Sequence, residues 1–405
     1  MKKTNQNTTL LLTVILISYF VVGFPDGAFT VSWLGISVDL GLTITHSGYI
    51  LVAYSVLYTL SGVMLSWLNR FLKLQMIYLL GLIIMGLGFI GLAVSTDFIM
   101  ALASIAAYGF GTGAMASSMN SYMAKHFSAR HNNWMHCFWG GGATLTPLIM
   151  SQMMLVFSWR MGYYVIVAIL AVVATILLVS MYKNIWINDD NVAQNTSEQT
   201  SESNKEHLTK KWHQVVEIAT FFFLGGTDYT LVFFTGMVLM ARGLSLEAVA
   251  LFPAVYYICM TLGRMFFGWI AKWIKEVPIV RIGCAVAFGG IVLLHFTNSI
   301  FGMAMTGFGL APLLPTLVSD TSNRFSPRII SKLVGYELAA FGAGIAVLFF
   351  LTSQLLELIS LELLFPIGLV FIVLVFICNE ILVRAIKAER GKTDEHSRRN
   401  GQKTA

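Results

Sequence analysis

Two aspartates, Asp26 and Asp228, each interrupt a long apolar run of the chain. The first lies in the stretch FVVGFPDGAFTVSW and the second in FFFLGGTDYTLVFF. A carboxylate inside a bilayer costs about 2.5–3.5 kcal/mol on insertion-based scales, so an acid in a membrane-crossing segment is a candidate functional group. Burial disfavours a charged carboxylate, and contact with water or a cation favours it again, so a change of exposure can load and release a proton. We therefore expect Asp26 and Asp228 to couple a proton or bind a solute.

Both aspartates also have a structural interpretation. Asp26 stands between Pro25 and Gly27, a sequence typical of a helix break, where the carboxylate could cap a helix end. Asp228 follows Gly225 and Gly226 and could bond a neighbouring hydroxyl. Either role accounts for an acid at these positions.

The composition indicates that lipid surrounds most of the chain. Charged residues make up 11% and apolar residues 57% of the sequence, and the mean hydropathy is +0.75. A soluble domain carries about 25% charged residues. Because a helix needs about 20 residues to cross the hydrocarbon core, the hydropathy predicts twelve membrane-spanning helices. We place them near residues 10–34, 48–68, 76–95, 99–122, 134–156, 161–182, 215–240, 249–271, 279–296, 300–319, 333–356 and 360–383.

The basic residues orient these helices in a cell membrane. With both termini in the cytoplasm, all but three of the 26 Lys and Arg residues fall on the cytoplasmic side, as the positive-inside rule requires. The exceptions are Arg160, Arg242 and Arg264. The net charge of +6 does not indicate a nucleic-acid partner, because the basic residues are scattered in short clusters between apolar runs.

A hydrophilic stretch divides the chain into two halves. Residues 183–212 are rich in Asn, Ser, Thr and Glu and predict a cytoplasmic linker. We expect a six-helix bundle at residues 1–182, a second at 213–385, and a cytoplasmic tail at 386–405, disordered after Arg384. We expect a monomer.

Further polar residues within the apolar segments are candidates for a relay or gate. Glu337 and Arg264 lie at similar predicted depths and could form a salt bridge that is either structural or part of a gate. An unperturbed histidine titrates near pH 6.5, so His136 is interpreted either as a proton relay or as a packed, hydrogen-bonded residue. Asn120 could bond a solute or a neighbouring helix.

Aromatic and amide side chains at membrane depth are suited to a sugar. Aromatic faces cover the C–H surface of a sugar, and amides and carboxylates satisfy its hydroxyl groups. Tyrosine and tryptophan also form interfacial belts, which is the alternative for each of them. The candidates for binding a solute are Asn120, Trp139, Gln152, Tyr54, Tyr58, Tyr229, Tyr256 and Tyr257.

The halves contain a weak internal repeat. The offset that places Asp26 on Asp228 also places Arg70 on Lys272. A slightly different offset superposes GFG at 109–111 and GFG at 307–309. Six helices per half make the repeat parallel, which predicts a twofold pseudo-symmetry axis along the membrane normal and a central cavity.

These residues resemble the major facilitator superfamily over essentially the whole chain. The region from Gly62 to Arg70 is similar to the family's cytoplasmic loop motif, and LGRMFFGWIAKWIK, which contains Gly263 and Gly268, is similar to its second copy. The aspartate usual in this motif is replaced by Ser66 and by Lys272. The resemblance implies a major facilitator fold, with two pseudo-symmetric six-helix bundles and transport by alternating access.

A narrower resemblance is to the fucose-permease-like sugar symporters. It is carried by GFGTGAMASSMNSYMAKHFSARHNNWMHCFWGGGATLTPLIM with the following SWRMGYY, and by GFGLAPLLPT and YELAAFGAGI. The fourth-helix glutamate of fucose permease has no counterpart in Ala116–Met119, so the resemblance implies the group rather than fucose as the solute.

The sequence therefore predicts a proton-coupled importer of a sugar or a similar small polar solute. An efflux carrier for amphipathic compounds is the alternative that the 29 Phe and 20 Met residues favour, and a transport-inactive membrane sensor is another. No nucleotide-binding loop, zinc-ligand spacing or catalytic triad is present in the sequence. We accordingly expect no enzyme activity, no cofactor and no metal.

Overall fold

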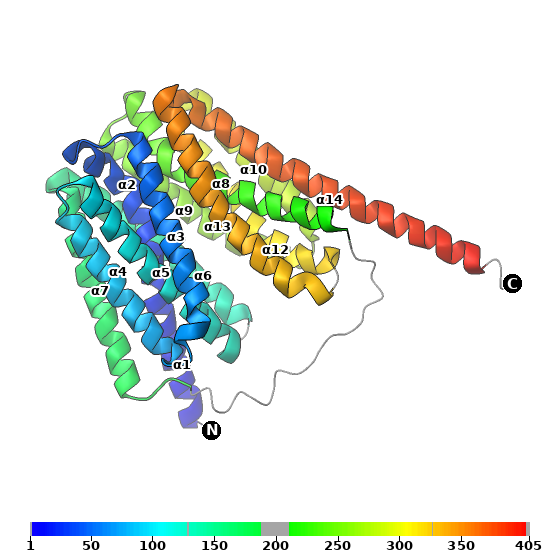
Figure 1. Ribbon diagram of the computed structural model, residues 1–405, viewed down its shortest axis with the longest axis horizontal. Helices are drawn as coiled ribbons and strands as arrows, with labels where there is room; N and C mark the ends of the chain where they lie inside the picture. The colour runs from blue at the N-terminus through cyan, green and yellow to red at the C-terminus, as the bar shows by residue number, and fades with distance from the viewer. Residues whose placement is uncertain (1, 128, 188–209, 326, 402–405) are drawn as a thin grey trace. The chain divides into compact units, whose positions relative to one another are not determined.

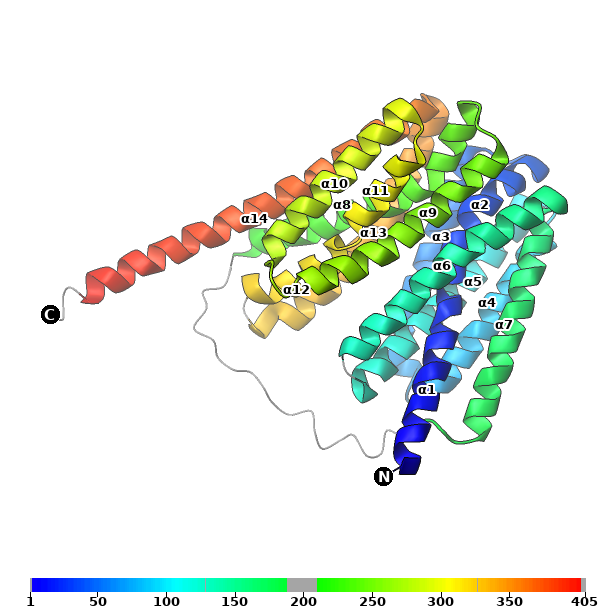
Figure 2. The same cartoon turned by 180° about the vertical axis from the view of Figure 1, so that it is seen from behind.

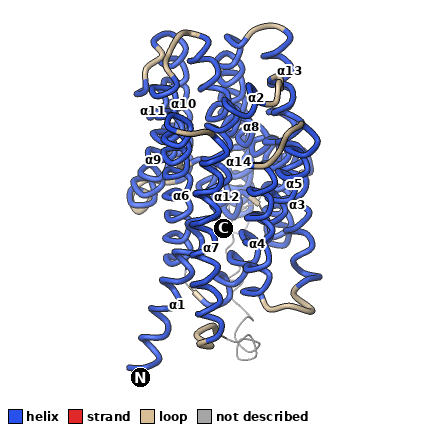
Figure 3. Tube along the Cα trace, turned by 90° about the vertical axis from the view of Figure 1, so that its left-hand side faces the viewer, coloured by secondary structure: helices blue, strands red, loops and turns tan. Residues whose placement is uncertain are grey.

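The computed structural model describes residues 2–127, 129–187, 210–325 and 327–401. Over these residues the chain forms helices joined by short loops, and the described part contains no strand (Figure 3). The chain packs into two compact units. Unit 1 comprises Met1–Ser197, Leu231–Thr261 and Phe349–Leu364, and unit 2 comprises Glu198–Thr230, Leu262–Leu348 and Phe365–Ala405.

Unit 1 is built around the first seven α-helices (Figure 1). Helix α5 packs against α3 and α4, α4 packs against α7, and α6 packs against α1, α2 and α7. The unit also takes in the C-terminal part of α8, most of α9 and the C-terminal end of α13. Its own helices are α1 (Lys2–Phe20), η1 (Val21–Gly23), α2 (Phe24–Asp39), α3 (Ile44–Leu68), α4 (Leu74–Ala93), α5 (Phe98–His126), α6 (Ala129–Val156), α7 (Trp159–Tyr182) and η3 (Leu361–Leu363).

Unit 2 holds the other parts of the second half (Figure 2). Helix α10 packs against α11 and α12, and α11 ends where Ala311 and Pro312 interrupt the path toward α12. The helices that contribute to this unit are α8 (Lys211–Ala241), α9 (Leu246–Ile270), α10 (Glu276–Thr297), α11 (Ile300–Leu310), α12 (Leu313–Arg324), α13 (Pro327–Leu358) and α14 (Leu364–Gly401).

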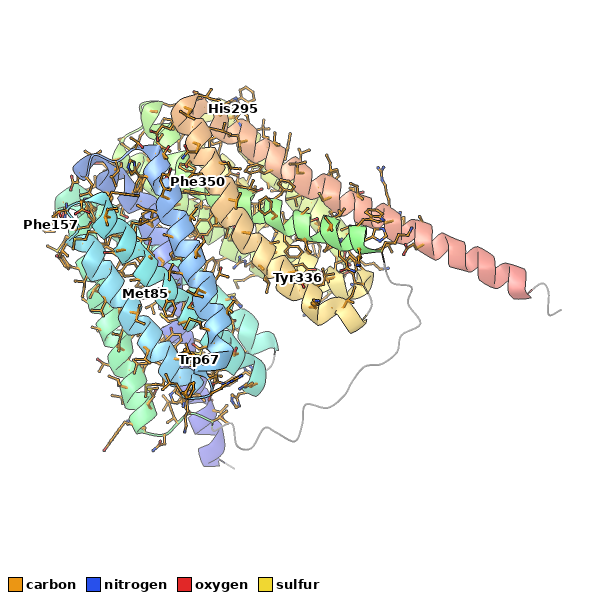
Figure 4. The ribbon with its side chains drawn as sticks, viewed as in Figure 1. Trp67, Met85, Phe157, His295, Tyr336 and Phe350 are labelled. Atoms are coloured by element: carbon orange, nitrogen blue, oxygen red, sulfur yellow. The ribbon has the colours of Figure 1, made fainter. Side chains whose placement is uncertain are left out.

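Eleven helices in the described part of the chain are long and apolar enough to cross a membrane. They coincide with eleven of the twelve expected segments, with α11 and α12 together forming one span. The twelfth expected segment, 134–156, is helical within α6 but is less apolar, because it carries polar side chains such as His136, Thr144 and Ser151. Large apolar side chains such as Trp67 and Phe157 are more than half exposed (Figure 4), as a lipid-facing surface requires.

The expectation of a disordered tail after Arg384 is wrong. Helix α14 continues to Gly401, and Figure 1 shows its red C-terminal part running past the other helices of unit 2. Ala, Lys, Glu and Arg follow one another here without a proline, and all four are strong helix formers. The linker expected at 183–212 lies largely outside the described residues, since 188–209 are not described.

The internal repeat has a structural counterpart in how glycines join neighbouring helices. In unit 1, a Cβ atom on Gly111 of α5 would lie 2.5 Å from the carbonyl oxygen of Gly81 on α4. In unit 2, a Cβ atom on Gly309 of α11 would lie 2.7 Å from the carbonyl oxygen of Gly283 on α10. Corresponding GFG stretches therefore make the same kind of close backbone contact in each unit.

Gly142→Ala is expected to destabilise the protein by about 1–3 kcal/mol, the usual cost of overpacking. An added Cβ atom would lie 1.8 Å from the backbone carbonyl oxygen of Phe20, which cannot rotate away, so α1 and α6 would have to separate. The measurement is the thermal midpoint of the purified protein in detergent.

The matched control for this prediction is Gly268→Ala on α9, where an added Cβ atom meets nothing within 4 Å. Alanine is favoured over glycine within a helix by about 0.5–1 kcal/mol, so this variant should be as stable as the wild type or more so. Equal midpoints for the two variants would show that the contact between α1 and α6 is not tight.

Candidate functional site

A break between α1 and α2 positions Asp26. The expected break at Pro25–Gly27 lies slightly earlier, at the 3-10 turn Val21–Gly23, and Pro25 falls in the first turn of α2. Asp26 is in the same first turn, where the helix dipole favours a negative charge. Its side chain is half-buried among buried neighbours. The carboxylate therefore lies at a helix start in the middle of a span.

Trp139 of α6 is a hydrogen-bond donor to this carboxylate. Its Nε1 lies 3.1 Å from Asp26 Oδ2. The indole ring also meets the ring of Tyr257 of α9 edge to face, with centroids 6.2 Å apart, and Tyr257 meets Tyr256 in the same manner at 5.4 Å. These four residues, all in unit 1, place a carboxylate beside aromatic faces and phenol groups, and sequence analysis had named all four.

Three tyrosines from α3 and α5 interact electrostatically with Asp26. They are Tyr54, Tyr58 and Tyr108. The ring of Tyr54 lies 5.9 Å from that of Tyr58 and 5.5 Å from that of Tyr108. Tyr108 is absent from the predicted set, although it stands directly before the GFG stretch that brings α5 against α4. We call Asp26, Trp139, Tyr54, Tyr58, Tyr108, Tyr256 and Tyr257 the Asp26 cluster.

Asn120 and His136 both contact Tyr19 of α1. Asn120 Nδ2 donates to the Tyr19 hydroxyl at 3.0 Å, and the His136 ring lies edge-on to the Tyr19 ring with centroids 5.5 Å apart. The structure thus shows Asn120 bonded to a neighbouring helix, one of its two expected roles. Gln152 lies further along α6, and its side chain is exposed.

Asp228 lies on α8 in unit 2. It is half-buried, as is the adjacent Tyr229. This part of α8 is held closely against α13, because a Cβ atom on Gly225 would lie 2.1 Å from the carbonyl oxygen of Phe341. Since Asp26 and Asp228 belong to different units, their access to one chamber stays a prediction.

A buried ionic cluster in unit 2 was missed by sequence analysis. Arg324 of α12 is 1% exposed and contacts two acids: Nη1 lies 3.0 Å from Glu217 Oε2 of α8, and Nη2 lies 2.7 Å from Asp320 Oδ2. Its Nη2 also donates to Asn379 Oδ1 of α14 at 2.6 Å. The signal in the sequence was the spacing of Asp320 and Arg324, which places them on one face of a helix.

Glu337 of α13 borders this ionic cluster. It is fully buried, and its Oε1 lies 2.9 Å from the hydroxyl oxygen of Thr321. Glu337 interacts electrostatically with Glu217 and Arg324. The salt bridge expected between Glu337 and Arg264 is not formed, because Oε1 bonds to Thr321 and Oε2 has no hydrogen-bond partner among the described residues.

The loop-motif residues lie in or just after α3 in unit 1 and within α9 in unit 2. Gly62 lies in α3, where a Cβ atom would lie 3.0 Å from Ser117 Oγ, and Arg70 is exposed just after that helix. Gly263 packs against α11–α12, where a Cβ atom would lie 2.7 Å from that of Ala311, whereas Gly268 has open space. Among the described residues, no group of three or more His, Cys, Asp or Glu side chains could hold a metal ion.

Comparisons with known proteins agree with this architecture. The family model described as Major Facilitator Superfamily matches residues 15–324. No curated protein sequence matches the chain. Among solved structures, a bacterial homologue of the human lysosomal transporter Spinster, inward-facing and occupied, is 14% identical with a TM-score of 0.71, covering 94% of this chain and 97% of its own.

Two other solved structures have the same fold. A variant of the nucleoside transporter NupG is 13% identical with a TM-score of 0.72, covering 93% of this chain and 99% of its own. The transporter FucP in its outward conformation is 14% identical with a TM-score of 0.61, covering 92% and 98%. The expected fold is therefore confirmed: an all-α membrane protein with twelve spans in two pseudo-symmetric bundles.

Proposed function

Because the chain belongs to the major facilitator superfamily, we propose that it is a secondary transporter that imports a sugar or a similar small polar solute together with a proton. Alternating access moves the solute: the binding site opens first to one side of the membrane and then to the other. Under this proposal the partners are the solute, protons and the lipid bilayer, and the protein works as a monomer.

The Asp26 cluster is the observation that carries the proposal. A carboxylate inside a membrane span is costly unless it has a function or a partner, and Trp139 Nε1 donates to this one at 3.1 Å. A carboxylate has about four lone-pair sites, enough to accept hydrogen bonds from solute hydroxyl groups as well as from protein donors, and it can also take up a proton. Trp139 is half-buried and offers an aromatic face for the C–H surface of a sugar, whereas Tyr257 is buried against the Trp139 ring.

The roles of the remaining residues follow from this arrangement. Tyr54 and Tyr58 provide hydroxyl groups near the Asp26 charge and can hydrogen-bond to a solute. Asp228 is the counterpart of Asp26 in the second bundle, and Tyr229 is its neighbour. A proton driven inward by the membrane potential contributes about 2.3 kcal/mol per 100 mV to uptake.

Contacts at one end of unit 1 support alternating access. Glu357, near the end of α13, accepts a hydrogen bond from the backbone N–H of Thr45 at the start of α3, at 2.6 Å. Nearby, the rings of Tyr49 and Phe350 are 5.2 Å apart. With bundles at 1–182 and 213–385 and both termini cytoplasmic, these are contacts between bundles on the external side. They would have to break when the protein opens outward.

A second candidate function is efflux of amphipathic compounds, which an aromatic cluster in unit 1 favours. Phe29 of α2 lies 5.3 Å from Phe233 of α8, and Phe349 of α13 stacks on Phe234 with centroids 4.5 Å apart. All four rings are buried, so they would have to move apart to take an apolar ligand. This phenylalanine cluster shares no residue with the Asp26 cluster. Uptake and efflux therefore predict different ligands: a polar solute and an apolar one.

A ligand panel followed by a proton-flux measurement tests the proposal. Monosaccharides, disaccharides, nucleosides and hydrophobic cations are added to the purified protein, because a ligand at 100 times its Kd stabilises the folded state by about 2.7 kcal/mol. The solute that raises the thermal midpoint is then added outside liposomes that contain the protein and a pH-sensitive dye.

The proposal expects a sugar or nucleoside to raise the midpoint and to acidify the liposome interior. A midpoint raised only by hydrophobic cations, with outward solute movement in exchange for protons, would support efflux and contradict uptake. Liposomes without protein and liposomes with an unselected sugar are the controls.

A further inference from the structure

The buried ionic cluster of unit 2 contains more negative than positive groups. Four helices contribute to it: Glu217 from α8, Asp320 and Arg324 from α12, Glu337 from α13 and Asn379 from α14. All five side chains belong to residues that are at most 5% exposed. Arg324 supplies one positive charge against three carboxyl groups, and buried charges need compensation. One more positive charge, such as a proton on a carboxyl group, would reduce the net negative charge of the cluster.

The hydrogen bonds of Arg324 go to groups other than Glu337. Nε donates to Asp320 Oδ2 at 2.8 Å, Nη1 to Glu217 Oε2 at 3.0 Å, and Nη2 to Asn379 Oδ1 at 2.6 Å. Asn323 Nδ2 adds a donor to Asp320 Oδ1 at 3.3 Å. The guanidinium group therefore neutralises Glu217 and Asp320 together, and Glu337 is left with the hydroxyl of Thr321.

The hydroxyl of Thr321 has a single hydrogen atom, two hydrogen-bonded oxygen neighbours and a further interaction with the Glu217 carboxylate. Its oxygen lies 2.9 Å from Glu337 Oε1 and 3.1 Å from the carbonyl oxygen of Leu317. A carbonyl oxygen can only accept, so if the hydroxyl donates to Leu317, the Glu337 oxygen must be the donor. A protonated Glu337 completes both hydrogen bonds, whereas an ionised one leaves them to share one hydrogen.

Two unpaired carboxyl oxygens in the same cluster also favour a protonated Glu337. Glu217 Oε1 and Glu337 Oε2 are buried and have no hydrogen-bond partner among the described residues. An ionised carboxylate with a buried, unpaired oxygen is strongly disfavoured, while a carboxylic acid tolerates the same position better. Glu217 keeps the charge of Arg324 beside it, so Glu337 is the acid that can be neutral.

The other titratable groups of these helices do not supply the missing charge. On α14, Cys378 is a thiol near Glu217 and Thr220, and Glu380 is bonded to Arg281 of α10, with Nε and Oε1 2.7 Å apart. On α8, His213 is buried and its Nδ1 has no hydrogen-bond partner among the described residues. The groups that act on Glu337 are Glu217 and Arg324.

We propose that Glu337 holds a proton in this structure and that the cluster around it is a proton-binding site separate from Asp26 and Asp228. The proton lies on Oε1, between Glu337 and the hydroxyl oxygen of Thr321. Its loss would leave a third negative charge beside Glu217 within a four-helix junction. The proposal does not depend on which solute is transported, because it concerns the protonation of one residue.

Infrared spectroscopy of the protein in lipid tests this site. A protonated carboxylic acid has a C=O stretching band that a carboxylate lacks. We expect this band to lose intensity in Glu337→Gln, whose amide can donate to Thr321 as the acid does. Glu380→Gln is the matched control, since Glu380 is ion-paired with Arg281 and its removal should leave the band intact.

A second measurement on the wild type keeps the test valid if Glu337→Gln does not fold. Labelling all glutamates with carbon-13 should shift part of the carboxylic acid band, while Asp26 and Asp228 contribute only unshifted intensity. A band that neither the substitution nor the label changes would overturn the proposal. A sodium-dependent rise in the thermal midpoint together with that result would show that the site takes a sodium ion instead.

Discussion

Asp26→Asn is expected to weaken solute binding about 10- to 100-fold and to remove its dependence on pH. A hydrogen bond to a charged group is worth about 1.5–3 kcal/mol, and each 1.4 kcal/mol is a tenfold change in affinity. The asparagine oxygen can still accept from Trp139 Nε1, so the contact between α2 and α6 should survive. The measurement is the Kd of the solute selected by the panel, determined across a range of pH.

Asp97→Asn is the matched control for this prediction. Asp97 is the N-cap of α5 and accepts from the backbone N–H of Met100 at 2.9 Å. Asparagine is about as good an N-cap as aspartate, so this variant should bind like the wild type. If Asp26→Asn binds as tightly as Asp97→Asn at every pH, Asp26 has only a structural role.

Arg324→Met is expected to destabilise the protein by about 3–5 kcal/mol, the cost of breaking a buried ion pair from one side. Methionine fills much of the arginine volume, but it leaves Glu217 and Asp320 buried without their shared cation. Asn379 also loses the donor to its Oδ1. The measurement is the thermal midpoint in detergent, together with the yield of folded protein.

Arg281→Met is the control for the buried cation. Arg281 pairs with Glu380 through Nε at 2.7 Å, but its side chain is 46% exposed. Water screens an exposed pair, so its loss should change the midpoint little. Equal midpoints for Arg281→Met and Arg324→Met would mean that the charges of the buried ionic cluster are not needed for stability.

The helix positions could be predicted well because hydropathy and the thickness of the bilayer determine them. The C-terminal end of α14 could not be predicted, since a polar helix that extends beyond the membrane has no hydropathy signal. Segment 134–156 was found from its length and flanks, even though the polar side chains of α6 lower its hydropathy. Of the polar groups on α6, the Trp139 indole faces the carboxylate of Asp26, whereas the hydroxyls of Thr144 and Ser151 bond to the backbone of α6 itself.

The candidate site could be predicted in part. Asp26, Trp139, Tyr54 and Tyr257 were found because polar and aromatic groups are conspicuous in apolar runs. Tyr108 was not distinguished, because a single tyrosine beside a glycine stretch gives no indication of what it faces.

The buried ionic cluster was missed for a different physical reason. Arg324 and Glu217 lie near the ends of their helices, where a charged residue normally reaches water. Only the packing of α8, α12 and α14 shows that these two side chains are enclosed. Sequence position alone cannot separate a solvated helix end from a buried one.

The most direct measurement of the central claim is solute-dependent proton entry into liposomes that contain the wild type, Asp26→Asn or Asp228→Asn. The claim is that these two carboxylates, one in each bundle, serve a single proton-coupled transport cycle. It predicts that the solute acidifies the lumen with the wild type and that both substitutions abolish the acidification while the proteins remain folded. Wild-type acidification with unchanged pH dependence in both variants would contradict it.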